Sequence, residues 1–504
     1  MLHPMELLPR PSNQRVAIAG EDRISELPDD VLVSILEKLG NTRQAVATSV
    51  LSRRWLHLPW RIRRPFLSIF QFLPRSARAG GEDGFKNLQQ RDLDRAIPPF
   101  VRAAMAFLAS PTATHCLALR FLLTDEEDDE LVYAVRHLLL AAGAAADAGG
   151  GGARCSSVQL DVRATADTTE AQMRDGARRR LLLTGLVARP RGLLITKLRL
   201  ERLWLTAADV AAVLGACARL VHLTLHGCRA GRGEGAALAI DGAPELRELV
   251  VRGCGYRRVE LRRAPKLVRL TLESWSSTTT TAPLRLAAAP CLREISLVNS
   301  CTRRSSQRFR LSELLASATN LDCLSLNFRN EEIWIQPEDS NRFVAAFGRL
   351  TTLSLCRIFD ECDLLWTLYL LKAAPSLRKF SIGVQKHSCQ YGGSEVKQRQ
   401  ILFPEKRNMF WIDFNFQHYH LAQLEICGFE ANDKYMILTR LIMEQAKNLK
   451  VVILSDEKTC DECDFQDDGT SSTGSSYPKN KEEKRLIQKQ LTEGISSPVR
   501  VLVL

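Results

Sequence analysis

One pattern of apolar residues recurs between Leu220 and Leu454 and limits the folds that this sequence can adopt. It consists of an apolar residue, two variable positions, a second apolar residue, one variable position and a third apolar residue. Successive first leucines are 26, 21, 25, 29, 29, 27, 44 and 28 residues apart. The pattern occurs as Leu220/Leu223/Leu225, Leu246/Leu249/Val251, Leu267/Leu270/Leu272, Leu292/Ile295/Leu297, Leu321/Leu324/Leu326, Leu350/Leu353/Leu355, Leu377/Phe380/Ile382, Leu421/Leu424/Ile426 and Leu449/Val452/Leu454.

This spacing indicates leucine-rich repeats, whose period is about 20 to 29 residues. Each unit offers a short strand and a return segment that cannot bury its apolar face alone, so neighbouring units must stack. Ala-Pro pairs at Pro244, Pro265, Pro290 and Pro375 are expected to end the return segment before the next strand. The predicted fold class is therefore α/β, an irregular solenoid with a curved parallel sheet on the concave side and helices and loops outside.

The first ordered unit is expected near Asp22. Asp29 and Asp30 precede VLVSILEKL, which predicts an amphipathic helix that ends at Gly40. A second helix is predicted after Thr42 and through Trp55. The polar stretch 74–100 is predicted to be a loop, and the 44-residue gap predicts an insertion around Gln390 to Arg407.

The resulting domain organisation has a disordered start, a small helical unit, the repeats and a C-terminal region. A low-complexity insertion is expected near 141–153 and an acidic flexible loop near 456–480. The boundaries are 1–21, 22–65, 66–109 (linker and first helical segment), 110–412 (repeats) and 413–504.

The segment DRISELPDDVLVSILEKLGNTRQAVATSVLSRRWLHLPW, Asp22 to Trp60, resembles the F-box of plant F-box proteins with leucine-rich repeats. The stretch from about Phe414 to Leu504 resembles the FBD region that ends many of these proteins. The resemblance implies binding to a Skp-type adaptor, and through it to a cullin. The sequence departs from the family pattern at Leu56 to Pro59, where the proline is expected to end the last helix early. The implied adaptor contacts are Leu27, Pro28, Leu32, Ile35, Leu36, Leu51 and Trp55.

Residues that alternate outward along the strands should line the concave face. They mix both signs of charge, which favours a protein target over a phosphate backbone. The candidate target-binding residues are His222, Glu248, Arg269, Glu294, Arg252, Glu273 and Lys379, in columns that also contain Thr352, Gln423, His226, Asn327 and Cys356.

The sequence offers no catalytic motif, and Cys460 with Cys463 forms a lone C-x-x-C where structural zinc usually needs four ligands. We expect no enzyme activity, no metal, no cofactor and no membrane span. The net charge of +12 comes mostly from scattered arginines, and cysteines within repeats, such as Cys217, Cys291 and Cys323, suit a reducing compartment.

The expected function is that of the substrate-recognition subunit of a Skp-cullin-F-box ubiquitin ligase, working in the cytoplasm, the nucleus or both. It would bring an unidentified target close to a separate ubiquitin-transferring enzyme. Two alternatives remain open. One is a receptor of the same type that needs a small molecule, and the other is a scaffold for nucleic acid or protein.

Overall fold

The computed structural model describes most of the chain, with gaps. The described residues are 24, 26–78, 88–110, 114–123, 133–135, 137–142, 155–164, 195–229, 237–273, 282–299, 309–329, 333–336, 338–360, 362–385, 416–456, 477–495 and 498–504. The N-terminus 1–21, the low-complexity insertion beyond residue 142, the Gln390–Arg407 insertion, Cys460, Cys463 and most of the acidic loop lie outside them.

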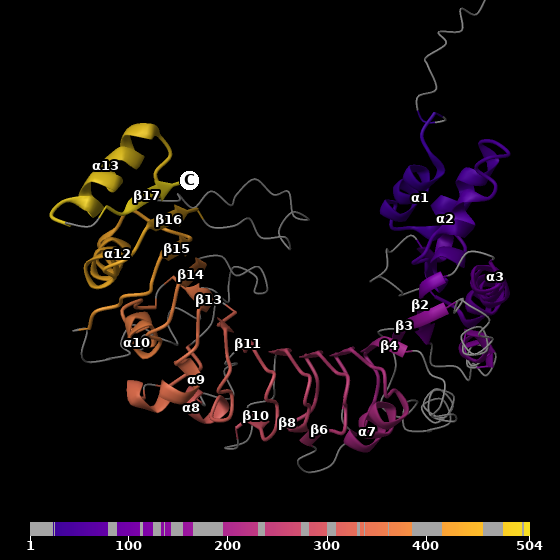
Figure 1. Ribbon diagram of the computed structural model, residues 1–504, viewed down its shortest axis with the longest axis horizontal. Helices are drawn as coiled ribbons and strands as arrows, with labels where there is room; N and C mark the ends of the chain where they lie inside the picture. The colour runs from indigo at the N-terminus through magenta and orange to yellow at the C-terminus, as the bar shows by residue number, and fades with distance from the viewer. Residues whose placement is uncertain are drawn as a thin grey trace, which may run out of the picture.

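The described strands form an arch, with the first helices at one end and the last helices at the other (Figure 1). One parallel sheet runs through the arch. Its strands, in spatial order, are β1 (Phe66–Ser68), β2 (Thr114–Leu123), β3 (Cys155–Ala164), β4 (Ile195–Glu201), β5 (His222–His226), β7 (Glu248–Arg252), β9 (Arg269–Glu273), β11 (Glu294–Val298), β12 (Cys323–Asn327), β13 (Thr352–Phe359), β14 (Lys379–Gln385), β15 (Gln423–Cys427), β16 (Val451–Ser455) and β17 (Arg500–Val503).

Helices flank this sheet at both ends and along its outer side. Short 3₁₀ turns occur at Thr48–Val50, Leu58–Arg61, Ile69–Phe72, Ser76–Arg78 and Ser340–Phe343. The α-helices are α1 (Asp29–Lys38), α2 (Thr42–Ala47), α3 (Gln90–Leu108), α7 (Ala207–Ala216), α8 (Leu311–Leu314), α9 (Val344–Phe347), α10 (Thr367–Ala373), α12 (Asp433–Gln445) and α13 (Lys481–Thr492).

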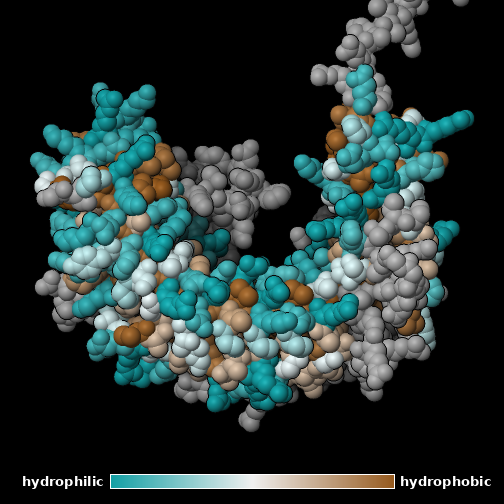
Figure 2. All heavy atoms as spheres, viewed as in Figure 1, coloured by the Kyte–Doolittle hydropathy of each residue, from teal (hydrophilic) through white to brown (hydrophobic). Residues whose placement is uncertain are grey.

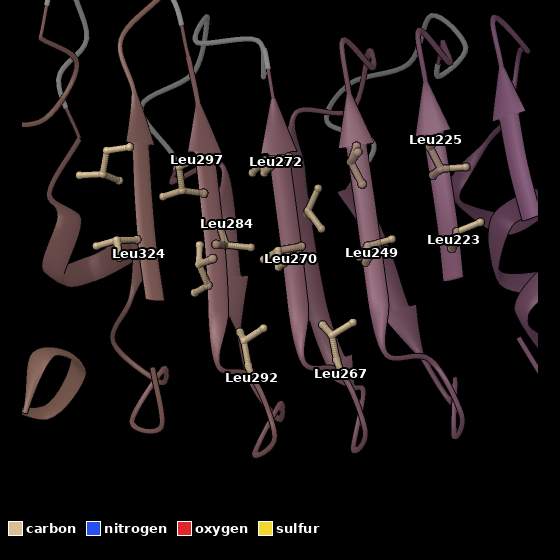
Figure 3. Close-up of a cluster of buried hydrophobic side chains, with 14 of the residues drawn as sticks. Leu223, Leu225, Leu249, Leu267, Leu270, Leu272, Leu284, Leu292, Leu297 and Leu324 are labelled. Atoms are coloured by element: carbon tan, nitrogen blue, oxygen red, sulfur yellow. The ribbon is translucent and has the colours of Figure 1, made fainter. Parts of the chain in front are cut away.

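The repeated apolar residues form the core, as the sequence pattern predicts. Leu223, Leu249 and Leu270 are in register on neighbouring strands and are fully buried. Figure 3 shows these leucines stacked from strand to strand. Burying one such side chain contributes about 1.5–3 kcal/mol, and each leucine contacts a repeat on either side. The predicted leucine-rich-repeat fold is confirmed.

The Ala-Pro turns also act as predicted. In each, the alanine carbonyl accepts a hydrogen bond from the leucine N–H three residues later, with proline at the second position of the turn. Proline favours this position because its φ is already fixed near −65°. The four bonds run to Leu246, Leu267, Leu292 and Leu377, at 3.1–3.4 Å.

The outer side of three repeats departs from the prediction of helices and loops. A second, three-stranded sheet lies there between α7 and α8, formed by β6 (Ala237–Asp241), β8 (Arg258–Arg263) and β10 (Leu284–Leu286) (Figure 1). The repeats that begin at Leu220, Leu246 and Leu267 are short, which leaves little room for a helix. In β6 and β10 buried and outward residues instead alternate, which is a strand pattern, and β8 between them buries Val259, Glu260 and Leu261 in succession.

Two secondary-structure predictions at the N-terminal end are wrong. The helix predicted from Thr42 through Trp55 ends at Ala47, where the Thr48 hydroxyl donates to the Ala45 carbonyl (2.7 Å) and the chain tightens into a 3₁₀ turn. There is consequently no long helix for Pro59 to end, and Pro59 lies buried near the start of the Leu58–Arg61 turn.

The second wrong prediction is the loop over 74–100. From Gln90 onward these residues belong to α3, which continues through Pro98 and Pro99. Leu93, Ile97 and Phe100 recur at helical spacing and are buried. Tertiary packing of this apolar face therefore overrides the two prolines.

The sheet is continuous across the predicted boundaries at residues 110 and 413. β1 pairs with β2, and β14 pairs with β15. Side chains from helical regions cover both edge strands, since the Phe66 N–H donates to Thr42 Oγ1 (2.9 Å) and Gln488 Nε2 donates to the Val501 carbonyl (3.0 Å). The helical unit and the repeats thus share one core and one sheet.

Candidate interaction surfaces

The first helix is apolar on two adjacent rows. Leu32 and Leu36 point inward and are buried, at 0% and 2% exposure. Val31, Ile35 and Leu39 recur every four residues on a neighbouring row and remain exposed. One row fills the core of the unit, so the other is available to a partner.

The segment after α2 exposes more apolar surface. Val50 is 87% exposed and Leu51 64% exposed, and Leu56 is exposed beside them in sequence. Figure 2 shows hydrophobic residues at this end of the arch, among hydrophilic ones. Patches of this kind on a soluble fold mark interaction sites more often than isolated apolar side chains do.

The structure corrects three of the predicted adaptor contacts. Leu32, Leu36 and Trp55 are buried within the unit, so they support it and do not form its surface. Of the other predicted contacts, Pro28, Ile35 and Leu51 are exposed and Leu27 is half-buried. The exposed apolar residues Val31, Leu39, Val50 and Leu56 were not among the predicted contacts, although the second apolar row of the helix is visible in the residue spacing.

An ion-pair network holds the chain at the entry to α1. Asp29 accepts hydrogen bonds from Arg54 Nε and Arg61 Nη1, both at 2.8 Å, and Arg54 Nη2 donates to the Leu27 carbonyl (2.5 Å). The Arg54 guanidinium, together with Arg61, lowers the pKa of Asp29. These contacts fix Leu27 and Pro28 against the segment that carries Leu51.

The concave columns predicted from the sequence are in register. His222, Glu248, Arg269 and Glu294 occupy matching positions on four successive strands, and Thr352, Lys379 and Gln423 continue the column beyond Cys323. The second column is also in register from strand to strand. It runs through His226, Arg252, Glu273, Val298, Asn327 and Cys356.

Neighbouring strands neutralise most of these charges. His222 lies 2.8 Å from Glu248, Arg252 lies 3.2 Å from Glu273, and Lys379 lies 3.0 Å from Glu425. Arg269 and Glu294 approach to 3.9 Å. The structure brings the predicted target-binding residues together mainly as ion pairs with one another, and their binding role stays a prediction.

Comparison with known proteins identifies the repeat region. The family model described as "At1g61320/AtMIF1, LRR domain" matches residues 187–500, more than half of the 504-residue chain. The chain belongs to this leucine-rich-repeat family.

Two curated plant proteins are similar over shorter stretches. The putative F-box/FBD/LRR-repeat protein At3g49030 of Arabidopsis thaliana is 39% identical over 72 residues, 14% of this chain and 16% of that protein. The meiotic F-box protein MOF of Oryza sativa subsp. japonica is 65% identical over 40 residues, 8% of each chain. The matches span less than a fifth of either relative. The predicted resemblance to plant F-box proteins with leucine-rich repeats is confirmed.

Before its first recognised leucine triplet, this F-box/leucine-rich-repeat chain carries a charge cluster that sequence reasoning missed. Arg120, Asp161 and Arg199 are in register on β2, β3 and β4. Asp161 lies 2.8 Å from Arg120, and Glu201 lies 2.9 Å from Arg199. The alternation of apolar residues in THCLALRFLL and CSSVQLDVRA could have revealed these strands and hence the outward charges between them.

Glu201 is the most perturbed carboxyl of this cluster. Its burial opposes ionisation, yet His226, Arg199 and Arg163 together lower its pKa to about 2. His226 Nδ1 lies 3.5 Å from the carboxylate, Arg163 Nε lies 3.4 Å from it and Arg199 Nη2 lies 2.9 Å from it. Glu201 therefore stays ionised and ties β3 to β4.

A polar hollow of about 720 Å³ lies where the F-box meets the repeats. Its walls include Glu37 of α1, Arg63 and His115. The Arg63 N–H donates to Glu37 Oε1 (2.9 Å), and the Arg63 carbonyl accepts from the His115 N–H (2.9 Å). Arg63 thus joins the first helix of the F-box to the second strand of the sheet.

Within the described residues, no group of three or more His, Cys, Asp or Glu side chains is arranged to hold a metal ion. A helix long and apolar enough to cross a membrane is likewise absent from that part of the chain.

Cys217, Cys228 and Cys254 are free and buried, whereas Cys291 is free but exposed, contrary to its expected place inside a repeat. Cys228 and Cys254 donate to strand carbonyls of the preceding repeat at 3.4 Å.

Proposed function

We propose that this chain is the substrate-recognition subunit of a Skp-cullin-F-box ubiquitin ligase. Its F-box would bind a Skp-type adaptor, and its repeats would bind a target protein for ubiquitination and degradation. The observation that carries the proposal is the exposed apolar surface of the F-box, which lies on a unit whose own core is already filled.

That core holds Leu32, Leu36 and Trp55, together with Ala45 and Leu58. Because these residues are buried already, the exposed Val50 and Leu51 are not needed to complete it. Large apolar side chains that become fully desolvated supply most of the affinity of protein interfaces. A groove on a helical adaptor would bury such side chains without unfolding the F-box.

The proposed mechanism is proximity. A ligase subunit that holds the adaptor at one end and a target along the arch converts ubiquitin transfer into an effectively intramolecular reaction. The bonds from Thr42 to Phe66 and from Glu37 to Arg63 support it, because they restrain the F-box relative to the repeats. We propose that the complex works in the cytoplasm, the nucleus or both, which free buried cysteines such as Cys217 support.

The test is copurification of a Skp-type adaptor with the full chain and with the variant Val50→Asp/Leu51→Asp. Both side chains are exposed, so the variant should keep the melting temperature of the wild type while losing the adaptor. A truncated chain that starts at residue 66 is a poorer test, because the truncation removes the Thr42 bond to β1 and part of the shared core.

Val344→Asp is the matched control, since Val344 is also 65% exposed but lies on α9. It should retain the adaptor. Equal recovery of the adaptor by the wild type and by Val50→Asp/Leu51→Asp would contradict the proposal.

A further inference from the structure

The turns that lead into the strands form a row along the amino-end edge of the parallel sheet, which we call the amino-end rim. The turns before β5, β7, β9, β11, β12, β13 and β14 are all fully described, and they span 217–221, 242–247, 264–268, 287–293, 315–322, 348–351 and 374–378. The Arg247 N–H donates to the Val221 carbonyl, and equivalent bonds at 2.8–3.0 Å continue from turn to turn as far as the Arg378 N–H. Figure 3 shows Leu267 and Leu292 where two of these turns enter their strands.

Basic side chains recur along this rim. Six of the seven turns contribute one basic residue each, and all six side chains are exposed. They are Arg219, Arg247, Lys266, Arg293, Arg349 and Arg378. These residues are far apart in the sequence, but the hydrogen-bonded row places their turns on neighbouring strands, which lie about 4.8 Å apart. Arginines that look scattered in the sequence are therefore aligned along one edge of the fold.

The seven turns supply fewer carboxylates than cations. Their acidic residues are Glu245 and Asp322. Glu245 lies 2.6 Å from Lys266 Nζ, and Asp322 lies 3.0 Å from Arg293 Nη1. The Arg293 side chain is 60% exposed even in this pair, so a partner can still reach it. The basic residues of the turns thus outnumber the acidic ones, whereas the columns of the concave floor pair most of their charges.

The backbone of the rim is fixed before any partner arrives. Four of the turns contain the Ala-Pro pairs, whose alanine carbonyls accept hydrogen bonds within the turn. Their prolines are exposed between the basic side chains, and these are Pro244, Pro265, Pro290 and Pro375. Because proline already restricts φ, little backbone entropy is lost when a partner binds there. The rim therefore presents its cations from a pre-formed edge.

We propose that the amino-end rim, from Arg219 to Arg378, is a docking surface for an acidic segment of a target protein. The inference rests on the proposed function, because it names the chemical class of that target. A guanidinium binds a carboxylate through two parallel hydrogen bonds, and arginine holds five of the six basic positions. The charge of the rim and the geometry of its donors both match a run of Asp and Glu side chains.

Two features of the rim favour a peptide over a nucleic acid strand. Single-stranded nucleic acids bind by stacking their bases on aromatic side chains beside a basic groove, and the seven turns contain no aromatic residue. Glu245 and Asp322 also interrupt the basic residues. Such carboxylates would repel a continuous phosphate backbone, but they leave room for the spaced carboxylates of a peptide.

The strand order sets the length of the segment. β5 and β14 are separated by six strand spacings, or about 29 Å at about 4.8 Å each. An extended chain covers that distance with about nine residues. An acidic peptide of about twelve residues should therefore reach from Arg219 to Arg378, and one of about four residues should not.

The experiment measures binding of a fluorescent twelve-residue polyglutamate peptide to the full chain by anisotropy, at low and at physiological salt. The variant Arg247→Gln/Arg349→Gln/Arg378→Gln should bind at least about tenfold more weakly. It should keep the melting temperature of wild type, because all three side chains are exposed. Arg91→Gln/Arg95→Gln/Arg102→Gln removes the same charge from exposed positions on α3 and should bind like wild type. A four-residue polyglutamate should bind more weakly than the longer peptide.

Asp322→Asn tests the rim in the opposite direction. This change removes the carboxylate that neutralises Arg293 and keeps a side chain of similar size in the turn. It should strengthen binding of the twelve-residue peptide several-fold. Added salt should weaken peptide binding by both wild type and this variant, because the contacts are exposed.

The inference is overturned if wild type does not bind the peptide, if the α3 variant loses as much affinity as the rim variant, or if Asp322→Asn binds the peptide no more tightly than wild type. Tighter binding of a twelve-nucleotide single-stranded DNA than of the peptide would overturn it too. The same preparations are tested for copurification of the Skp-type adaptor. Adaptor binding without peptide binding defeats this inference alone, whereas wild type that recovers no adaptor defeats the proposed function.

Discussion

At the F-box end of the arch, apolar side chains such as Val50 and Leu51 lie exposed, whereas on the concave floor charged side chains such as Arg252 and Glu273 have opposite charges beside them. A partner that covers the first surface buries apolar area, which stabilises the complex. A partner that covers the second stabilises the complex little, because it must replace ion pairs that the chain already makes.

This difference assigns different tasks to the two regions. An apolar surface of fixed shape suits a partner that is shared by many proteins of one architecture. A floor whose charges are mostly paired within the chain discourages indiscriminate binding and favours a target whose charges match its pattern. Three changes in the chain would test whether the two regions are as separate as this contrast implies.

The largest effect is expected in the core that both regions share. Leu353→Ala in β13 removes a fully buried side chain and should lower the free energy of unfolding by about 2–5 kcal/mol. Urea denaturation of the full chain measures this free energy of unfolding. Val344→Ala on the exposed surface should change the free energy of unfolding by less than about 0.5 kcal/mol. Similar losses in both variants would contradict the packing described for the repeats.

A somewhat smaller effect is expected at Glu201. Glu201→Gln removes one of the two carboxylates, Glu201 and Asp161, that Arg163 and Arg199 share, and should cost about 3 kcal/mol. The folded pKa of about 2 lies below the ordinary value of 4.5, so the contribution is full above pH 4.5 and is lost as pH falls toward 2.

Melting curves between pH 2 and pH 6 separate this charge effect from simple loss of packing. The difference in melting temperature between wild type and Glu201→Gln should become smaller as pH falls through this window. A gap that stays constant down to pH 2 would mean that the Glu201 charge is not what stabilises the strands. Glu248→Gln, at a more exposed ion pair, provides the control.

The smallest effect is expected on the concave floor itself. His222→Ala, Glu248→Ala and the double variant form a cycle whose coupling energy should be under about 1 kcal/mol, because the pair is partly exposed. Added salt should reduce it further. A coupling above about 2 kcal/mol would show that this floor is held as rigidly as the core.

The sequence was sufficient for the repeats because each strand repeats the same inward residues. Matching Leu223 with Leu249 and Leu270 automatically aligns His222 with Glu248 and Arg269, so the concave columns follow from periodicity. The early strands β2 to β4 lie within the predicted repeat region 110–412, but their positions were not predicted because they fall outside that regular series of triplets.

Periodicity could not divide the F-box residues between core and surface. Ile35 and Leu36 are neighbours on one helix, and burial of Leu36 depends on where the rest of the unit packs. The left-handed backbone of Arg202, directly after β4, was equally hidden, because the neighbouring repeats have glycine at that turn and this one does not. Such features arise from tertiary contacts, to which local sequence patterns are insensitive.

The most direct test of the central claim is site-specific photocrosslinking of the full chain to a Skp-type adaptor. A photoreactive amino acid is placed in turn at Ile35, Leu51 and Val344, and the crosslinked adaptor peptides are identified by mass spectrometry. Crosslinks from Ile35 and Leu51, and none from Val344, are expected if the exposed apolar face of the F-box is the adaptor surface. Crosslinks from Val344 with none from the two F-box positions would contradict that assignment.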